Sequence, residues 1–464
     1  MITADKAFLS AIDEKADLLL EKINSAKDNV TFSGKAYYVS AKDGNDLNDG
    51  LSPEKAIKSL DRVHTLPLEF GDAVLLERGC EWRGNGISLN LNGITIAAYG
   101  DGEKPIINIS LKNYAVPCEW LKTDTENVWK YKYPFGVDVG HIVCDGKVHC
   151  IKKCKGHHGF GDDYKELSED LEFYCDRFNE NYLYFHSENN PGERFRLMEI
   201  QRYVPGILIG AKSDIRVDNI KIVNAFFGIS SGSIVNFHVS NCEFGFIGGS
   251  GRFNGNSETM VRLGNGIEVY GFCTNFTVEN CYFHDIYDAG VTHQRGGNSP
   301  IPIVMENVVY RENLFERCIY SIEYFNNCNH EEDIMRHIRF TDNICRYAGG
   351  FGWQRPNKFA RHIQGGWKGV INRKSPCEDY VVEGNIFDRS IDTILSISSI
   401  KESHLPKMRG NTYVQYAKKP YGANFIPYDR DLPFDEETEK FIKETRGETD
   451  AVVAVVPEYD GMCD

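Results

Sequence analysis

The chain lacks both the long apolar runs of a membrane protein and the cysteine content of a disulfide-stabilised one. No window of its 464 residues approaches 18 uninterrupted apolar residues, and residues 1–23 are charged throughout instead of having a basic start and an apolar core. We therefore expect neither a membrane span nor a signal peptide. The 14 cysteines are about 3% of the chain, so reduced thiols and a cytoplasmic location are the simplest expectation.

An excess of basic charge is also missing. Lys and Arg number 52 against 67 Asp and Glu, which gives a formal net charge of −15 at pH 7. Neutralising phosphates requires concentrated Lys and Arg, so this balance argues against nucleic acid as a partner. The sequence has no glycine-rich phosphate loop and no G-x-S-x-G motif, which makes kinases, dehydrogenases and serine hydrolases poor candidates. We expect no cofactor.

Two segments contain potential metal ligands without the spacing that metals require. In residues 144–158 the pattern Cys-x5-Cys-x3-Cys precedes His157 and His158, and it matches no paired Cys-x2-Cys site. In residues 44–50 (GNDLNDG) the oxygen ligands lack EF-hand spacing, so a turn is the favoured interpretation. We expect no bound metal.

Residues 213–399 contain a repeat. Each of six segments begins with alternating apolar residues, reaches an asparagine and continues into a second short strand; the asparagines are Asn219, Asn241, Asn280, Asn313, Asn343 and Asn385. Period-two alternation indicates strands with one inward face. The shortest repeat, 22 residues, is shorter than a strand-helix-strand unit of roughly 30. The pattern predicts an all-β parallel β-helix with an asparagine ladder, and surface turn asparagines are the alternative.

A resemblance accompanies this pattern. The run YYVSAKDGNDLNDGLSPEKAIKSLDRV, the following GDAVLLERGCEWRG and the asparagine repeats resemble the right-handed parallel β-helix carbohydrate-active proteins of the pectate-lyase-like superfamily. The resemblance covers residues 36 to about 415. It implies a right-handed solenoid and activity on carbohydrate, as a lyase or a glycoside hydrolase. Residues 115–205 interrupt the repeat and resemble the inserted β-rich module of β-helix glycoside hydrolases of the bacterial β-xylosidase type.

The expected organisation has five parts. They are an N-terminal amphipathic helix in residues 1–30, the first coils in 36–114, the inserted module in 115–205, the main coils with the groove in 206–415, and a C-terminal extension with a helix in 416–464. The helical spacing of Phe8, Ile12, Ala16, Leu19 and Ile23 suits a helix that caps the first coil or docks on another subunit. The second case would make the protein an oligomer.

Four stretches are longer than the shortest turn of the repeat requires, namely residues 248–263, 295–305, 326–336 and 355–378. We expect all four to follow the second strand of their turn and to wall a groove along one face. In the aligned second strands, the inward residues are Ile267, Val291, Ile322, Phe351 and Ile394. Alternation then turns Glu268, Thr292 and Glu323 outward on three successive rungs. The same outer face continues with Tyr270, Gln294, Phe325 and Gln354.

Two carboxylates that face one groove could perform acid and base catalysis. Two rungs separate Glu268 from Glu323, about 9 to 10 Å at the backbone, and inverting glycoside hydrolases have carboxyl separations of about 6.5–9.5 Å. Asp288 lies on the intervening rung as a third member or alternate, and Asp285 is a further acidic candidate that a turn role explains better. The resemblance to β-xylosidases supports acidic catalysts on stacked strands without fixing the pair. The alternative is that these acids only bind sugar hydroxyls or a cation.

The last insertion is basic. Residues 355–374 carry six Lys and Arg and no acid, which favours an anionic ligand group such as a uronate, or a loop that balances the acidic floor. The residues expected to bind substrate are Tyr270, Thr292, His293, Gln294, Trp353, Gln354, Arg355, His362 and Trp367. Alternation points His293 inward unless the strand ends there.

Three functions remain open. The first is a glycoside hydrolase that cleaves an oligosaccharide by carboxylate catalysis. The second is a polysaccharide lyase acting on a uronate, with His293, Tyr324, Arg355 and Lys358 as its candidate groups. The third is a carbohydrate-binding protein without catalysis.

Overall fold

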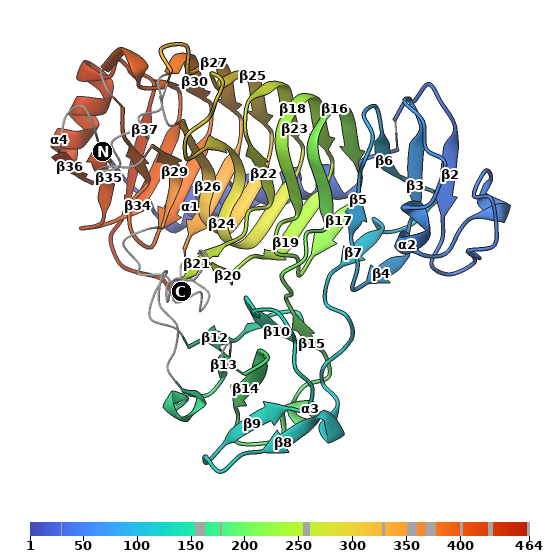
Figure 1. Ribbon diagram of the computed structural model, residues 1–464. Coiled ribbons are helices and arrows are strands. Elements are labelled where there is room, and N and C mark those ends of the chain that lie inside the picture. Colours follow the sequence, from blue (N-terminus) through green and yellow to red (C-terminus); the bar gives the residue numbers. More distant parts are fainter. Residues whose placement is uncertain are drawn as a thin grey trace.

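The chain winds as a parallel solenoid (Figure 1). The computed structural model describes residues 1–28, 30–153, 163–176, 179–253, 260–326, 330–349, 360–366, 377–399, 402–425 and 430–461. In these ranges 27 strands form one hydrogen-bonded assembly, in which almost every pairing joins a strand to its counterpart one turn away in parallel. The fold is therefore the parallel β-helix that the repeat predicts.

Three sheets run along the solenoid. The first contains β2 (Ala36–Val39), β3 (Ala73–Glu77), β6 (Thr95–Tyr99), β23 (Cys273–Glu279), β25 (Val304–Arg311), β27 (Ile334–Thr341), β30 (Cys377–Glu383) and β33 (Lys407–Arg409). The second contains β4 (Glu81–Arg83), β7 (Ile106–Asn108), β17 (Lys221–Val223), β19 (Glu243–Ile247), β28 (Ile344–Ala348), β31 (Ile386–Ser390), β34 (Thr412–Tyr416) and β37 (Val452–Val456). The third contains β5 (Ile87–Ser88), β22 (Ile267–Tyr270), β29 (Arg361–Gly365), β32 (Leu395–Ile397) and β35 (Pro420–Phe425).

Four longer strands turn a corner and belong to two sheets. β16 (Ile207–Asp218) and β18 (Ile229–Ser240) join the third sheet to the first. β24 (Tyr282–Arg295) and β26 (Leu314–Asn326) join the second sheet to the third. Continuity around these corners fixes the position of each strand relative to the next sheet.

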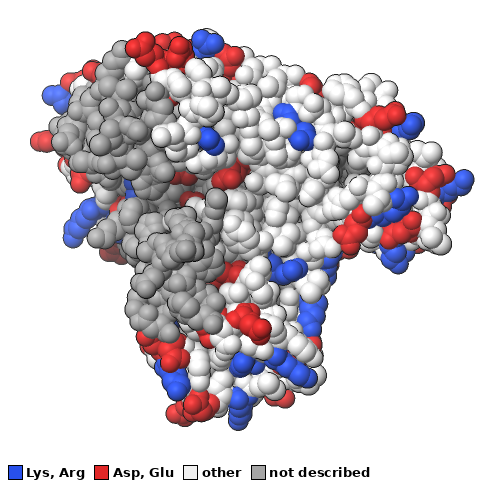
Figure 2. Space-filling view, in the orientation of Figure 1, with Lys and Arg blue, Asp and Glu red and all other residues white. Residues whose placement is uncertain are grey.

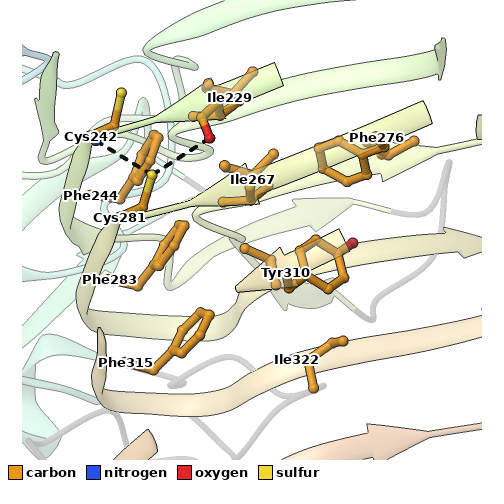
Figure 3. Close-up of a cluster of buried hydrophobic side chains, with 14 of the residues drawn as sticks. Ile229, Cys242, Phe244, Ile267, Phe276, Cys281, Phe283, Tyr310, Phe315 and Ile322 are labelled. Atoms are coloured by element: carbon orange, nitrogen blue, oxygen red, sulfur yellow. Dashed lines mark hydrogen bonds between the residues drawn. The ribbon is translucent and has the colours of Figure 1, made fainter. Parts of the chain in front are cut away.

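Aromatic side chains stack inside the solenoid with the spacing of the strands. The ring centroids of Phe244 and Phe283 are 4.9 Å apart, as are those of Phe283 and Phe315. Figure 3 shows these three rings in one column, with Ile267 and Ile322 beside them. Because neighbouring strands lie about 4.8 Å apart, equivalent residues of successive turns contact one another directly. The stacking therefore indicates that successive turns of the solenoid are in register.

The asparagine ladder occupies the corner between the first and second sheets. The Asn313 side chain donates to Oδ1 of Asn343, Asn343 donates to Asn385, and Asn385 donates to Asn411. Each of these oxygens also accepts from the backbone N–H one turn back. Glu448 ends the series, because its carboxylate accepts from the side chain and the N–H of Asn411. All four asparagines are buried and their amides are paired along the chain of turns.

The prediction that Asn219, Asn241 and Asn280 belong to the ladder is wrong by one residue position. Asn219, Asn241 and Asn280 have positive φ values of 56°, 54° and 50° and lie one residue before the interior position. Asparagine tolerates this left-handed conformation better than most residues, which accounts for its recurrence there. After Asn241 and Asn280 cysteines fill the interior position, and the N–H of Cys242 donates to the sulfur of Cys281 (Figure 3). After Asn219 this position is filled by Ile220. The turn interpretation thus fits Asn241 and Asn280, whereas Asn219 has the same left-handed conformation but is fully buried. The ladder interpretation is right for Asn313, Asn343 and Asn385.

The N-terminal helix α1 (Lys6–Asn24) lies along the side of the solenoid, behind the coils in Figure 1. Ile12, Ala16 and Ile23 are buried against the second sheet, where they meet residues such as Leu314 and Val414. The preceding strand β1 (Ile2–Thr3) pairs with β37 of the last coil. The prediction that this helix caps the first coil is therefore wrong, and its apolar face is occupied within its own chain.

The first coil is covered by the loop that contains GNDLNDG. Val39 of β2 forms a parallel bridge with Ile57, so the loop pairs with the free edge of the strand. One carboxylate oxygen of Asp46 accepts from the N–H groups of Lys58 and Ser59, and the side chain of Asn48 donates to Ala56. These polar side chains serve the backbone of a capping loop.

The inserted module hangs below the coils in Figure 1. One of its sheets contains β8 (Trp120–Lys122), β9 (Val128–Tyr131), β12 (Ile151–Lys152), β13 (Glu172–Asp176) and β14 (Tyr182–His186). The other contains β10 (Ile142–Cys144), β11 (Val148–His149) and β15 (Met198–Ile200). Trp120, Phe173 and Phe185 belong to a buried cluster that is separate from the core of the solenoid.

The C-terminal extension contains the expected helix. It begins as α4 (Glu436–Lys440), capped by the side chain of Asp435, and continues as the π-helical segment η6 (Phe441–Thr445). Phe441 and Ile442 pack into the core of the solenoid. Across the ranges given above, no helix has the length and apolarity that crossing a membrane requires.

Breaking the ladder should destabilise the fold. Replacing Asn343 by Ala leaves a buried amide of Asn313, the carbonyl of Tyr310 and an acceptor site on Asn385 without their partner. Unpaired buried polar groups cost about 1–3 kcal/mol each, so we expect Asn343→Ala to lose at least about 2 kcal/mol in chemical denaturation. Asn307→Gly is the control: Asn307 belongs to an exposed asparagine pair at a positive φ, which glycine accepts. Equal losses in the two variants would contradict this account.

Candidate active site

The third sheet brings two of the predicted carboxylates onto one face. β22 pairs with β24 so that Glu268 lies beside Thr292, and β24 pairs with β26 so that Thr292 lies beside Glu323. On the same rungs Ile267, Val291 and Ile322 are fully buried in the core. The side-chain alternation of a strand therefore turns Glu268, Thr292 and Glu323 to the outer face, on three consecutive rungs.

The surroundings of these groups differ from rung to rung. Glu323 is only 5% exposed and Thr292 is fully buried. Glu268 is partly exposed and accepts a hydrogen bond of 2.9 Å from the side-chain amide of Asn265. The oxygen of the same amide accepts from the N–H of Ala289. Asn265, which the sequence analysis did not single out, thus holds Glu268 in place and ties it to the next turn.

Asp288 lies in a β-bulge at the corner where β24 passes from the second sheet to the third. The pairing of β24 with β26 is regular to Ile286 and resumes at Ala289, one position out of step. Asp288 is buried and directly precedes Ala289, whose N–H bonds Asn265. The bulge therefore places Asp288 at the corner where the third sheet begins.

Asp285 lies at the same corner and is held by several ion pairs. Its backbone has a φ of +53°, and its carboxylate contacts Arg317 at 2.8 Å, the His284 ring at 2.7 Å and His149 of the inserted module at 3.6 Å. These partners hold the pKa of Asp285 far below its usual range, although burial opposes them. Asp285 is therefore a buried, ionised group that links this corner to the inserted module, and its candidate catalytic role stays a prediction.

The two candidate histidines are interior residues. His293 lies 2.9 Å from the hydroxyl of Tyr310, and its ring stacks on Tyr324. The ring nitrogens of His362 lie 3.2 Å from the Ser321 hydroxyl and 3.2 Å from the carbonyl of Arg389. Both rings are fully buried, and burial lowers the pKa of each to about 3. Neither residue faces the groove, so both substrate-binding predictions are wrong.

Tyr270, Gln294 and Phe325 follow the row of carboxylates on the outer face. Tyr270 is 37% exposed, its hydroxyl accepts from the N–H of Gly296, and the Arg295 guanidinium lies 5.3 Å from its ring. Gln294 and Phe325 are buried. An exposed aromatic ring beside carboxylates is suited to stacking on a sugar.

The coil that contains β29 differs from the aligned repeat. The strand that follows β26 in the third sheet is β29, in which Ile363 pairs with Ile322 and Gln364 with Glu323. The alignment had assigned these places to residues around Phe351, so the interior residue of this rung is Ile363 and the outer one Gln364. Of the proposed substrate-binding residues, Trp353, Gln354, Arg355 and Trp367 lie outside the described residues, as do Phe351, Lys358 and the last potential metal ligands, Cys154, His157 and His158.

The described insertions arise from two corners instead of one, and most of the fourth, residues 355–378, lies outside the described residues. Residues 250–263 include the hairpin of β20 (Ser250–Phe253) and β21 (Met260–Leu263), which precedes β22 instead of following it. The stretches after β24 and β26 do follow third-sheet strands, as expected.

Figure 2 shows few charged side chains over the middle coils of this face and many on the module and at the ends of the solenoid.

The hairpin joins the inserted module to the edge of the site. Ser250 donates to the carbonyl of Asp138, and the N–H of Gly251 donates to the Asp138 carboxylate, which also binds Lys152. From β21, the buried guanidinium of Arg262 lies 4.2 Å from the ring of Tyr287 in the bulge. The module, the hairpin and the bulge thus form one connected structure beside the carboxylates.

Comparison with known proteins gives distant similarities. No protein-family model matches the chain. It is 24% identical over 262 residues to a lacto-N-biosidase of Bifidobacterium longum subsp. longum, an alignment that covers 54% of this chain and 15% of the relative. The chain therefore spans a small part of that protein's length. In sequence it is similar to a protein named for activity on carbohydrate.

Two solved structures are also similar. The GH136 lacto-N-biosidase from Eubacterium ramulus matches at 13% identity, over 98% of this chain and 70% of that one, with a TM-score of 0.38. A hyperthermoactive exopolygalacturonase from Thermotoga maritima matches at 12% identity, over 86% of this chain and 85% of that one, with a TM-score of 0.40.

The buried histidines should make the protein sensitive to acid. His141, His293 and His362 each have a pKa lowered to about 3 by burial, whereas the unfolded chain protonates them near 6.5. Between these values the unfolded state binds more protons, so stability falls as pH falls from about 6.5, by up to about 4 kcal/mol per pH unit for three protons. We expect urea denaturation at pH 7, 6 and 5 to show this slope, and His362→Gln to reduce it by about one proton. An unchanged slope in that variant would contradict the assignment of His362 as a neutral interior group.

Proposed function

We propose that the chain is a glycoside hydrolase that cleaves an oligosaccharide in the groove along the third sheet. Glu268 and Glu323 are its principal carboxylates, and Asp288 is the third member or alternate. The observation that supports this most directly is the strand register, which aligns Glu268 with Thr292 and Thr292 with Glu323 on one outer face.

The spacing suits hydrolysis of a glycosidic bond. Two rungs place the backbones of Glu268 and Glu323 about 9.5 Å apart, and side chains that lean toward one another bring the carboxyl groups within the separations used by glycosidases. One carboxylic acid would protonate the departing oxygen, while the other carboxylate would attack the sugar or activate water. The hydrogen bond from Asn265 limits the motion of Glu268 and so keeps its carboxylate in position.

The sequence relative favours hydrolysis over elimination. That relative is a lacto-N-biosidase, and this name is that of a glycosidase. A lyase would need a group to neutralise the uronate carboxyl and a base to remove the proton beside it. The histidine considered for that role, His293, is buried inside the solenoid beneath the groove.

Removing either carboxylate should abolish turnover. We expect Glu268→Gln and Glu323→Gln each to lower kcat by about a thousandfold or more, because an amide neither donates a proton to the leaving oxygen nor attacks the sugar. Glu268 is partly exposed, so Glu268→Gln should change the melting temperature little. Glu323 is only 5% exposed, but glutamine keeps nearly the same shape, so Glu323→Gln should still fold. The control is Glu306→Gln, which alters an acidic residue of the first sheet that pairs with Arg336. A Gln variant with ordinary turnover would remove that residue from the mechanism.

The product should distinguish a hydrolase from a lyase. We expect a panel of neutral oligosaccharides to yield new reducing ends without new absorbance in the near ultraviolet, because hydrolysis adds water across the bond. Elimination from a uronate instead creates an unsaturated, absorbing product. Absorbance that grows with time on uronate-containing glycans, with no cleavage of neutral ones, would replace the hydrolase by the lyase.

A further inference from the structure

The outer row of the groove continues beyond Glu323. Gln364 of β29 pairs with Glu323, and Ser396 of β32 pairs with Gln364. Gln364 is 2% exposed and Ser396 is 4% exposed. In the opposite direction the row becomes open, and Leu208 is 42% exposed. The enclosed part of the row therefore extends from Thr292 through Glu323 and Gln364 to Ser396.

In the side-chain amide of Gln364, the nitrogen is hydrogen-bonded, whereas the oxygen has no hydrogen bond to a described residue. Its nitrogen donates to the carbonyl of Gly366, and only the nitrogen can donate, so the oxygen must point the other way. That oxygen is buried and accepts no hydrogen bond from any described residue. A buried acceptor without a donor costs about 1–3 kcal/mol. The fold thus keeps an acceptor beside Glu323 at a cost to its own stability.

Thr292 repeats this arrangement on the other side of Glu323. Its hydroxyl is buried and has no hydrogen-bond partner in the described part of the chain. A valine of the same shape would remove this cost, since the strand would gain an apolar group there. Glu323 is therefore flanked, one rung away in each direction, by a buried polar atom that lacks a partner.

The interior asparagines show that this fold can pair its buried amides. In the ladder, Oδ1 of Asn343 accepts two hydrogen bonds and its nitrogen donates two. The unused oxygen of Gln364 lies on the face that carries the carboxylates, where a bound molecule could supply the donor.

We propose that Gln364 is a specificity-determining residue that accepts a hydrogen bond from a hydroxyl of the sugar bound at Glu323, with the Thr292 hydroxyl contacting the same ligand from the other side. The proposal rests on the proposed glycosidase function. Because the oxygen of Gln364 is an acceptor with a fixed orientation, it recognises a donor and rejects an analogue in which that hydroxyl is replaced by hydrogen or methylated. Glu323 is one rung away, so the recognised hydroxyl belongs to a sugar next to the bond that is cleaved.

The test measures binding separately from catalysis. In a Glu268→Gln background, which keeps the glycan intact, titration calorimetry is carried out with the oligosaccharide that the unaltered protein cleaves best. We expect Gln364→Met and Thr292→Val each to raise Kd about tenfold, the effect of one hydrogen bond. Thr292→Val should also leave the melting temperature unchanged or raise it. Weaker binding together with undiminished stability is a combination that a merely structural role would not produce.

Gln415→Met is the matched control. Gln415 is also a fully buried glutamine, but its oxygen accepts from the N–H groups of Ser390 and Tyr416. Its replacement should lower the melting temperature and leave Kd unchanged. A deoxy or O-methyl analogue of the glycan should bind the Gln364→Met protein as tightly as the natural sugar does.

The outcomes separate the two proposals. An unchanged Kd in both Gln364→Met and Thr292→Val would mean that water satisfies these atoms, and it would overturn this inference while leaving the glycosidase intact. If no glycan is cleaved by the unaltered protein and none binds the Glu268→Gln variant, both the function and the inference fall. If Gln364→Met does not fold, Thr292→Val decides the matter alone, because it preserves shape.

Discussion

Everything in this molecule depends on the hydrogen bonding of each turn to the same positions of the next. Strands about 4.8 Å apart carry equivalent side chains into contact, as the columns of phenylalanines at 4.9 Å show. The same spacing lets each asparagine amide of the ladder hydrogen-bond to the asparagine of the next turn. The ladder ends at the carboxylate of Glu448, which accepts from Asn411. A repeat of this kind fixes a residue in space by its position within the turn. The groove is one consequence, because residues far apart in sequence become neighbours.

The irregularities in strand pairing lie at the corners of the solenoid, where they disturb the alignment of the sheets least. Positive φ values recur at equivalent corner positions, including Phe246, Asp285 and Arg317. The bulge at Tyr287 and Asp288 also lies at a corner, between the second and third sheets. A corner can absorb an extra residue because the regular strand pairing is interrupted there, whereas an extra residue inside a regular stretch would turn the outer side chains inward. Insertions and the docking of the module therefore leave the rungs of the third sheet aligned.

The sequence predicted the solenoid, the rungs of Glu268, Thr292 and Glu323, and the interruption by a β-rich segment, because each depends on local alternation. It failed where alternation is ambiguous. Asn219 and Asn313 look alike in sequence, yet one occupies a left-handed corner and the other the interior. The rung of Gln364 was missed because the apolar run around Phe351 fits a strand equally well. The path of helix α1 could not be predicted, since its apolar stripe fits any covered sheet.

The outer faces of the three sheets explain why the candidate site lies on the third. The first sheet carries cross-strand pairs of opposite charge, such as Glu306 with Arg336 and Asp379 with Arg339, which suit a face in water. The second sheet is covered by helix α1 and the ion pairs around Asp285. The third sheet instead turns buried polar atoms outward without pairing all of them, as at Gln364. A ligand that supplies hydrogen-bond donors to such atoms gains binding free energy there, and this is the face that carries both glutamates.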